Sequence, residues 1–314
     1  MSIKNVTVIG GGVLGSQIAY QTAYAGFNAT VWLRSEASIE RAKPKFERLH
    51  KIYVAELTAA KENPGAPVSR GLVFNETDPA KFELDQKIKH AESAYQNLVF
   101  ELDLAKAVAD ADLVIEALAE DVAQKNEFYA KLAPVLPEKS IVATNSSTLL
   151  PSMFAEATGR PAKYLALHFA NNIWIGNTAE VMGHAATDQA VFDEVVAFAE
   201  AIGMVALKVL KEQPGYILNS LLVPFLFAAE ALWANGVADV ETIDKTWMLA
   251  TGAPRGPFRI LDIIGLTTPY NIVMMKPEAK EPGTSAYNIA QKLKEYIDAG
   301  KTGINAGEGF YKYK

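Results

Sequence analysis

Cysteine is absent from the 314 residues of this chain. Without it the protein can form no disulfide, no thiolate metal site and no cysteine nucleophile, and its absence is consistent with a reducing, cytoplasmic location. Histidine is scarce too, since His50, His90, His168 and His184 are the four in the sequence. Their spacing matches no metal-ligand motif, so we expect no bound metal.

Blocks of positive charge are also missing. The 30 lysines and arginines are outnumbered by 36 acidic residues, which gives a formal net charge of −6 at pH 7. Nucleic acids and anionic membrane surfaces bind basic patches, so neither is an expected partner. Half of the residues are hydrophobic, which is enough to bury a large core.

Export and membrane signals are weak. The N-terminus, MSIKNVTVIGGG, enters an apolar run at once and lacks the long apolar region and cleavage site of a secretory signal. The most apolar long stretch, 216–238, approaches the length of a membrane span but contains Asn219, Pro224 and Glu230. We therefore expect a buried helix there.

The order of β-rich and helical patterns predicts the fold class. Residues 5–147 alternate helical segments with four strand-like runs, NVTVIGG, NATVWL, ADLVIEA and KSIVATN. This spacing needs crossover helices and hence a mainly parallel sheet. Three further runs, YLALHFA, TAEVMGH and MVALKVL, are expected to extend the same sheet. The prediction is an α/β, doubly wound, mainly parallel sheet followed by an all-α domain.

A domain boundary is expected where the pattern changes. After KEQPG at 211–215 the sequence becomes helical. We expect residues 1–210 to form a dinucleotide-binding domain and residues 211–314 a helical second domain. A polar, charge-dense segment at about 43–96 is expected to be a helical excursion with a Pro/Gly loop at its tip.

A glycine-rich turn follows the first predicted strand. Gly10, Gly12 and Gly15 form the pattern G-x-G-x-x-G, in which the first allows a tight turn, the second leaves room for a pyrophosphate and the third lets helix and strand pack closely. Val13 and Leu14 begin the next helical pattern, whose N-terminus would face the phosphates. The turn predicts dinucleotide binding; a structural turn without a ligand is the alternative.

An arginine occupies the place where NAD-binding chains usually have an acidic residue. Arg34 and Ser35 follow the second predicted strand. A carboxylate there binds the adenosine ribose hydroxyls and repels a 2′-phosphate, whereas a guanidinium pairs with that phosphate. We therefore favour NADP as the cofactor, with NAD and a solvated Arg34 as the alternative.

A second group of polar residues lies on later strands. Ser147 follows its run and His168 comes late in its own, so both should lie at the carboxyl ends of strands, where open α/β sheets bind ligands. The short turn after His168 could bring Glu180 beside it, where a carboxylate would orient the imidazole. The alternatives are a packed core histidine and a solvated carboxylate.

Several motifs together resemble the 3-hydroxyacyl-CoA dehydrogenase family. They are, in order, IGGGVLGSQIA, VIEALAEDVAQKNEFYAKL, TNSSTL, LHFANN, AEVM, PGYILNSLLVPFLFAAE, GAPRGPFRILDIIG and GEGFYKYK. The resemblance covers nearly the whole chain. It implies a Rossmann-like domain followed by a helical domain through which subunits pair, and hence a homodimer.

The resemblance also implies roles for individual residues. Ser147 matches the serine that binds the substrate 3-oxygen, His168 the catalytic base, Glu180 its orienting carboxylate and Asn219 the active-site asparagine. The positions that match those around the nicotinamide are Ala117, Glu120, Lys125 and Asn145. Taken singly, Glu120 and Lys125 could equally be surface charges at the start of a helix.

The chain departs from the family pattern near the substrate. The family's HFFNP is HFANN here, with Ala170 and Asn172, and Asn177 replaces a frequent lysine. The serine and lysine that often contact coenzyme A have no match in the excursion. The leading hypothesis is an NAD(P)-dependent dehydrogenase of a short-chain 3-hydroxyacyl-CoA. A dehydrogenase of a free 3-hydroxy acid and a non-catalytic dinucleotide-binding protein are the alternatives.

Overall fold

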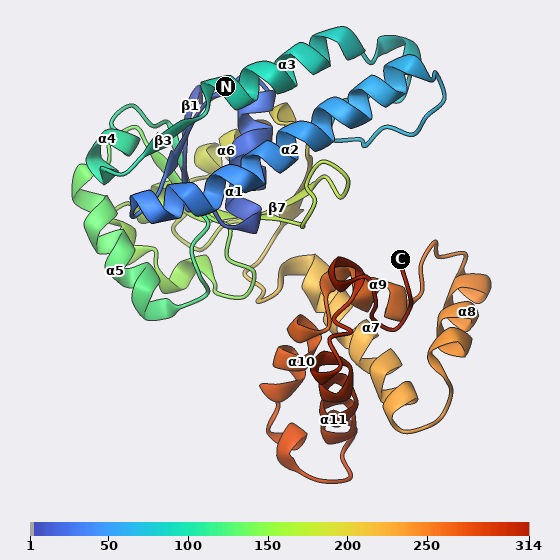
Figure 1. Cartoon of the computed structure of the whole chain (residues 1–314). Coiled ribbons are helices and arrows are strands. Elements are labelled where there is room, and N and C mark those ends of the chain that lie inside the picture. The colour runs from blue at the N-terminus through green and yellow to red at the C-terminus, as the bar shows by residue number, and fades with distance from the viewer. Residues whose placement is uncertain (1–2, 314) are drawn as a thin grey trace. The chain divides into compact units, whose positions relative to one another are not determined.

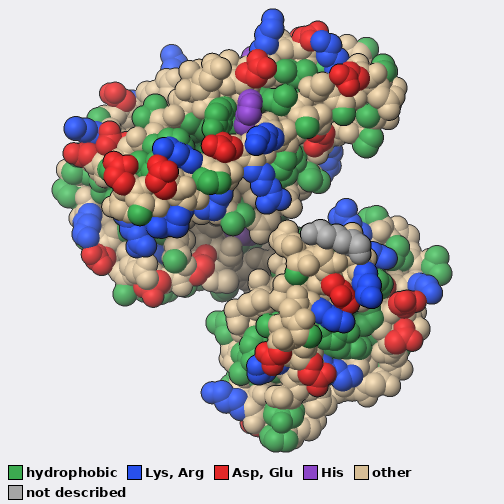
Figure 2. Space-filling model, in the orientation of Figure 1, with side chains coloured by type: hydrophobic (Ala, Val, Ile, Leu, Met, Phe, Trp, Pro, Cys, Tyr) green, Lys and Arg blue, Asp and Glu red, His purple; other side chains and the backbone are tan. Residues whose placement is uncertain are grey.

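The computed structural model describes residues 3–313, and the chain divides into two compact units, Met1–Ile217 and Leu218–Lys314 (Figure 1). The first unit contains the sheet, and the second is built from helices. The 211–215 segment, where the sequence pattern changes, comes just before the division. On the face drawn in Figure 2, acidic and basic side chains lie among one another on each unit.

One eight-stranded sheet organises the first unit, in the order β3-β2-β1-β4-β5-β6-β7-β8. Its strands are β1 (Asn5–Ile9), β2 (Asn28–Trp32), β3 (Val99–Glu101), β4 (Leu113–Glu116), β5 (Ile141–Thr144), β6 (Tyr164–Phe169), β7 (Thr178–Met182) and β8 (Val205–Val209). Neighbouring strands are parallel except β6 and β7, which are antiparallel. The mainly parallel sheet predicted from the sequence is confirmed.

Helices cover both faces of this sheet. They are α1 (Val13–Tyr24), α2 (Glu36–Glu62), α3 (Leu84–Asn97), α4 (Leu104–Val108), α5 (Val122–Leu132) and α6 (Gln189–Ala201). One hydrophobic cluster joins α1, α2, α3 and α6 to strand residues such as Val8, and a second joins α5 to residues such as Ile9. Successive side chains of a strand point to opposite faces, which places Val8 and Ile9 in different clusters.

The excursion after β2 is a pair of long helices that pack on each other and on α1 (Figure 1). Tyr53 of α2 is fully buried, and its ring meets Tyr20 and Tyr24 of α1 edge to face. Its hydroxyl donates to Gln21 Oε1 at 2.6 Å. The excursion is therefore anchored to the core through aromatic contacts on α1.

The second unit consists of α7 (Tyr216–Ala234, whose first two residues belong to the first unit), α8 (Val240–Thr251), α9 (Pro257–Ile264), α10 (Thr267–Met274) and α11 (Ser285–Asp298). Its C-terminal segment is held by Asp262, a carboxylate that is 1% exposed. Asp262 accepts the N–H groups of Phe310 and Tyr311 and the hydroxyl of Tyr313, at 2.8 to 3.0 Å. A Cβ at Gly309 would overlap that carboxylate, which explains a glycine in GEGFY.

The expectation of a buried helix at 216–238 is wrong. In the described part of the chain, α7 is the one helix whose length and apolar character meet the requirements of a membrane span. Only 22% of its most apolar window is buried, and Leu221 is 70% exposed. The helix thus keeps an apolar surface, although Asn219, Pro224 and Glu230 interrupt its apolar run.

Candidate active site

The glycine turn has the geometry that a pyrophosphate site requires. Gly10 has φ of +105°, and a Cβ there would lie 2.9 Å from the carbonyl oxygen of Ala117. A Cβ at Gly15 would overlap the carbonyl of Gly10, whereas one at Gly12 would meet open space. No side chain caps the N-terminus of α1, which begins at Val13. Room at Gly12 and uncapped helical N–H groups fit an anionic ligand.

Basic side chains line the pocket that contains this turn. The pocket encloses about 320 Å³, and its lining includes the turn, Arg34, Arg41 and Lys45. Arg41 donates to Ser38 Oγ at 2.9 Å, and Lys45 donates to the Gly11 carbonyl at 3.2 Å. The Arg34 side chain is exposed. Arg41 and Lys45 were not predicted from the sequence. They lie four residues apart, and therefore on one face of α2.

Ser35 begins α2 as its N-terminal cap. Its Oγ accepts the Ser38 N–H at 3.3 Å and lies 3.0 Å from Ser38 Oγ. The hydroxyl oxygen thus caps α2, and a contact of Ser35 with the cofactor, expected from its place beside Arg34, stays a prediction.

Ser147, His168 and Glu180 form one continuous line of polar contacts. His168 of β6 and Glu180 of β7 are directly opposite each other in the antiparallel pair. His168 Nδ1 lies 3.0 Å from Glu180 Oε2, and Nε2 lies 3.2 Å from Ser147 Oγ. His168 and Glu180 are 4% and 3% exposed, and Ser147, just after β5, is half-buried. The short β6–β7 connection thus brings Glu180 beside His168.

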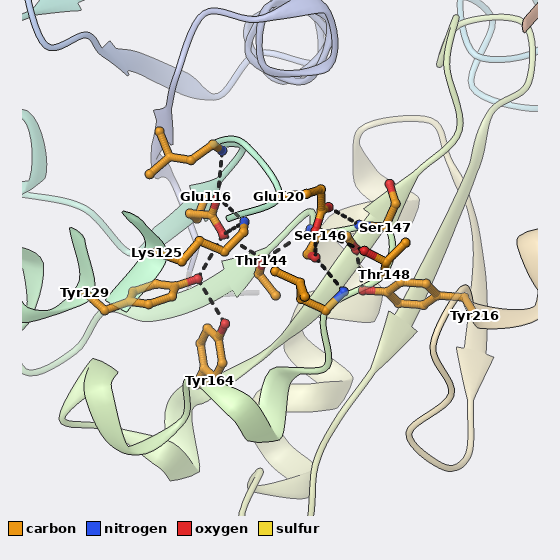
Figure 3. A network of polar contacts seen from close by, with 12 residues as sticks. Glu116, Glu120, Lys125, Tyr129, Thr144, Ser146, Ser147, Thr148, Tyr164 and Tyr216 are labelled. Atoms are coloured by element: carbon orange, nitrogen blue, oxygen red, sulfur yellow. Dashed lines mark hydrogen bonds and ion pairs between the residues drawn. The ribbon is translucent and has the colours of Figure 1, made fainter. Parts of the chain in front are cut away.

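Glu120 holds the loop that carries Ser147. Its Oε1 accepts the Ser147 N–H at 2.6 Å, and its Oε2 accepts the Ser146 hydroxyl at 2.7 Å and that of Thr148 at 3.3 Å (Figure 3). These contacts fix the backbone of the serine loop, so Glu120 positions Ser147. Its expected place near the nicotinamide stays a prediction.

Lys125 is buried in an ion pair that the sequence analysis did not find. Its Nζ lies 2.6 Å from both carboxylate oxygens of Glu116, and neither side chain is exposed (Figure 3). Glu116 also accepts the hydroxyls of Tyr129 and Thr144 and the N–H of Leu118. The alternative of a surface charge is therefore wrong for Lys125. Lys125 supports the 117–120 loop through Glu116, and direct contact with the nicotinamide stays a prediction.

The proton of Tyr129 stays on its hydroxyl in this network. Burial first, and then the Glu116 carboxylate, raise the pKa of Tyr129 well above its ordinary value. The hydroxyl therefore donates to Glu116 at 3.0 Å and lies 2.9 Å from the Tyr164 hydroxyl. A signal for the network is present in the sequence: Glu116 ends the otherwise apolar run LVIE.

The remaining expected residues lie in different surroundings. Asn145 accepts the Phe169 N–H on Oδ1 at 3.0 Å, so it links the ends of β5 and β6. Ala117 lines the pocket of the glycine turn. Asn219 belongs to the second unit, and its expected role at the substrate oxygen stays a prediction.

Two departures from the family pattern have structural explanations. Asn172 has φ of +57°, which proline cannot adopt, and its N–H donates to Gln17 Oε1 at 2.9 Å. Asn177 is fully buried and donates to the Gly203 carbonyl at 2.8 Å and to Asn75 Oδ1 at 2.6 Å. Nothing in the structure explains Ala170.

Among residues 3–313, no three histidine, aspartate or glutamate side chains are placed to hold a metal ion together.

The chain is similar to proteins of one enzyme family along its whole length. The family models that match are the 3-hydroxyacyl-CoA dehydrogenase NAD binding domain, over residues 5–88 and 75–213, and the C-terminal domain of the same enzymes, over residues 215–313. Human mitochondrial hydroxyacyl-coenzyme A dehydrogenase is 32% identical, with 99% of this chain and 92% of that protein covered. A probable 3-hydroxybutyryl-CoA dehydrogenase of Bacillus subtilis is 31% identical, with 100% and 99% covered.

Solved structures agree with this assignment. The structure of a diketoreductase, described as performing substrate-directed dual catalysis of dicarbonyl compounds, is 49% identical, has a TM-score of 0.85 and is covered completely, as is this chain. Mycobacterium tuberculosis FadB2 is 29% identical with a TM-score of 0.78 and complete coverage of both chains. The match to the NAD binding domain supports a nicotinamide cofactor, and its place in the pocket of the glycine turn stays a prediction.

Proposed function

Because the chain belongs to the 3-hydroxyacyl-CoA dehydrogenase family, we propose that it transfers a hydride between a nicotinamide and C3 of a small 3-hydroxy or 3-oxo compound. The observation that carries the proposal is the line of contacts from Glu180 through His168 to Ser147. It ends near the carboxyl ends of β5 and β6, the edge at which sheets of this kind bind ligands.

His168 is the proposed acid and base. Glu180 accepts hydrogen bonds on both oxygens, from His168 Nδ1 and from the Ile217 N–H at 2.8 Å. A carboxylate in this position keeps the proton on Nδ1, so the lone pair of Nε2 faces Ser147 and a substrate hydroxyl. In oxidation Nε2 accepts the hydroxyl proton, and a nicotinamide held at the glycine turn would supply the acceptor for the hydride of C3. In reduction His168 returns the proton to the oxygen.

Ser147 is the proposed holder of the reacting oxygen. Its backbone is fixed by Glu120, and its hydroxyl lies next to His168 Nε2. A donor that is held in place before the reaction stabilises the developing charge without having to reorganise. Asn219, matched through the family, is the proposed second donor. Neither residue acts as a nucleophile in this scheme.

Two substrate classes are open, and one observation favours each. The family and its curated relatives support a short-chain 3-hydroxyacyl-CoA. The diketoreductase, at 49% identity, is described as acting on dicarbonyl compounds, and this supports a dicarbonyl substrate for which we propose a free 3-oxo compound. That identity is well above the 31% and 32% of the two acyl-CoA dehydrogenases, and the HFANN turn departs from the family at the substrate. We therefore place free 3-oxo compounds first and acyl-CoA second.

NADP is the proposed cofactor. Arg34 is exposed at the pocket of the glycine turn, and Arg41 and Lys45 line that pocket as well. No acidic residue is among the pocket's lining. A guanidinium offers several donors in one plane, which suits the 2′-phosphate of the adenosine ribose. This concentration of positive charge supports NADP over NAD.

A homodimer is the proposed assembly, and α7 its proposed contact. The exposed apolar surface of α7 includes Leu221 and Leu232, which is 44% exposed. Exposed apolar surface of this kind marks a site of association, and closed symmetric pairs are the commonest oligomers. The cytoplasmic location expected from the sequence stays a prediction.

The test of the proposed function compares one acyl group in two forms. Purified protein with NADPH would be given acetoacetyl-CoA and ethyl acetoacetate, and the loss of NADPH absorbance would be followed. We expect turnover of both, with the higher kcat/KM for ethyl acetoacetate. A higher kcat/KM for acetoacetyl-CoA would reverse the order of the two substrate classes. Binding of NADPH without turnover of either would favour the non-catalytic alternative.

A further inference from the structure

Two adjacent residues, Tyr216 and Ile217, contact His168, Glu180 and the residue before Ser147. The Tyr216 ring stacks on the His168 imidazole, with centroids 4.4 Å apart and an angle of 12° between the planes. Its hydroxyl donates to the Ser146 carbonyl at 2.8 Å, one residue before Ser147 (Figure 3). The Ile217 N–H donates to Glu180 Oε1 at 2.8 Å. These are the last two residues of the first unit.

The backbone of this turn is held in an uncommon conformation. Tyr216 has φ of +53°, directly after Gly215 at +80°. A bulky residue in the left-handed region is strained and persists where the surroundings determine it. Here the surroundings are complete, because Tyr216 is 1% exposed and packs with Ala166, Met182 and Val209. This conformation directs the ring towards His168 while the next N–H meets Glu180.

The stack restricts a motion that the hydrogen bonds leave open. Glu180 contacts Nδ1 of His168 and Ser147 contacts Nε2, and two contacts along one line still let the ring plane rotate about that line. A flat ring parallel to the imidazole fixes its plane and therefore the direction of Nε2. On the other side of the line, the Tyr216 hydroxyl and Glu120 hold the serine loop from two directions, through the Ser146 carbonyl and the Ser147 N–H.

We propose that Tyr216 is a positioning residue for the reaction, fixing the imidazole plane of His168 through its ring and the Ser147 loop through its hydroxyl. This rests on the proposed function, because it requires that His168 and Ser147 act on the substrate. With its side chain 1% exposed inside the first unit, Tyr216 is not part of the exposed apolar surface of α7.

The test separates the ring from the hydroxyl with two substitutions in the full-length protein. Tyr216→Phe keeps the stack and removes the bond to Ser146, and we expect kcat with NADPH and ethyl acetoacetate to fall about three- to tenfold. Tyr216→Met fills a similar volume without a flat ring, and kcat should fall at least about tenfold further. The KM for ethyl acetoacetate and the Kd for NADPH should stay within about twofold, because positioning acts on the reacting geometry.

Tyr20 provides the matched control. It is also fully buried, and its hydroxyl donates to the Ala91 carbonyl at 2.8 Å, away from the proposed site. Tyr20→Phe should lower stability by a similar amount and leave kcat unchanged. The proposal is overturned if Tyr216→Phe keeps wild-type kcat, if its loss lies in KM alone, or if Tyr20→Phe loses kcat equally. Should Tyr216→Met not fold, Tyr216→Phe decides by itself.

A further variant, His168→Ala, measured in the same assay, keeps the two proposals apart. His168→Ala that retained wild-type kcat would remove the proposed function and this inference with it. His168→Ala that lost kcat, together with an unchanged Tyr216→Phe, would leave the acid–base pair standing and remove the positioning role of Tyr216.

Discussion

The ammonium group of Lys125 lies 2.6 Å from both carboxylate oxygens of Glu116, with neither side chain exposed to solvent. Removing one member of a buried ion pair leaves an uncompensated charge. Lys125→Met should therefore lower the free energy of unfolding by about 3–5 kcal/mol, measured by urea denaturation. Adding Glu116→Gln, whose amide keeps hydrogen-bonding groups beside Leu118 and Tyr129, should recover part of that loss.

The exposed pair of Lys131 and Glu127 is the control for this prediction. Its atoms are also 2.6 Å apart, but both side chains are largely exposed. Lys131→Met should change the unfolding free energy by less than about 1 kcal/mol, because solvent screens such pairs. An equal loss in Lys125→Met and Lys131→Met would contradict the argument from burial.

Arg34 should decide the choice between the two cofactors. In Arg34→Asp the carboxylate would repel a 2′-phosphate and accept hydrogen bonds from ribose hydroxyls. We expect kcat/KM for NADPH to fall about ten- to a hundredfold, since one charge-assisted hydrogen bond is worth roughly 1.5–3 kcal/mol, while NADH loses little. Arg48→Asp makes the same charge change at an exposed position of α2 outside the pocket, and it should leave the ratio unchanged. Equal efficiencies with both cofactors in the wild type would refute the NADP assignment.

Glu230 should make the stability of the protein depend on pH. Glu230 is 2% exposed, and its Oε1 has no hydrogen-bond partner among the residues that the structure describes. Burial raises the pKa of Glu230 from 4.5 to about 8. Between these values the unfolded chain has lost the proton and the folded protein has kept it, so the unfolding free energy should fall as pH rises.

The matching measurement is the unfolding free energy of wild type and Glu230→Gln at several pH values. The two should be similarly stable near pH 4.5, and the variant should gain on the order of 3–5 kcal/mol relative to wild type by pH 8. Glu295→Gln, the same change at an exposed position of the second unit, should follow the wild type. A constant difference between wild type and Glu230→Gln across this range would show that the group does not titrate as described.

Leu221 tests the proposed dimer. It is 70% exposed on α7, and a charge there would have to be desolvated in an apolar interface. Leu221→Glu should convert the dimer to monomer in light scattering at micromolar concentration. Val99→Glu, on the exposed edge strand β3 of the other unit, should not. A wild-type protein that is already monomeric would remove the proposal.

Regular patterns made most of the fold predictable. The seven longer strands follow from β-rich runs with helical segments between them, and the turn at Gly10, Gly12 and Gly15 follows from its position between strand and helix. β3 was missed because three residues, Val99–Glu101, are too few to show a period. The exposure of α7 was missed because an apolar run looks the same whether it packs inside its own fold or leaves an apolar surface.

Residues that act through others were the hardest to predict. His168 and Glu180 could be paired because a short turn joins their strands. Glu116 gave one weak signal, an acidic residue at the end of a buried strand. Tyr216 gave no signal in the sequence. Its stacking on His168 depends on a left-handed backbone conformation that the residue types at 211–217 do not predict.

His168, oriented by Glu180, is the group that we propose moves the proton of the reaction. This role is tested by measuring kcat for His168→Ala with NADPH and ethyl acetoacetate, beside the Kd for NADPH. We expect kcat to fall about a hundredfold or more, the usual contribution of a positioned general acid or base, and the Kd for NADPH to stay unchanged. Wild-type kcat in His168→Ala, with both ethyl acetoacetate and acetoacetyl-CoA, would contradict it.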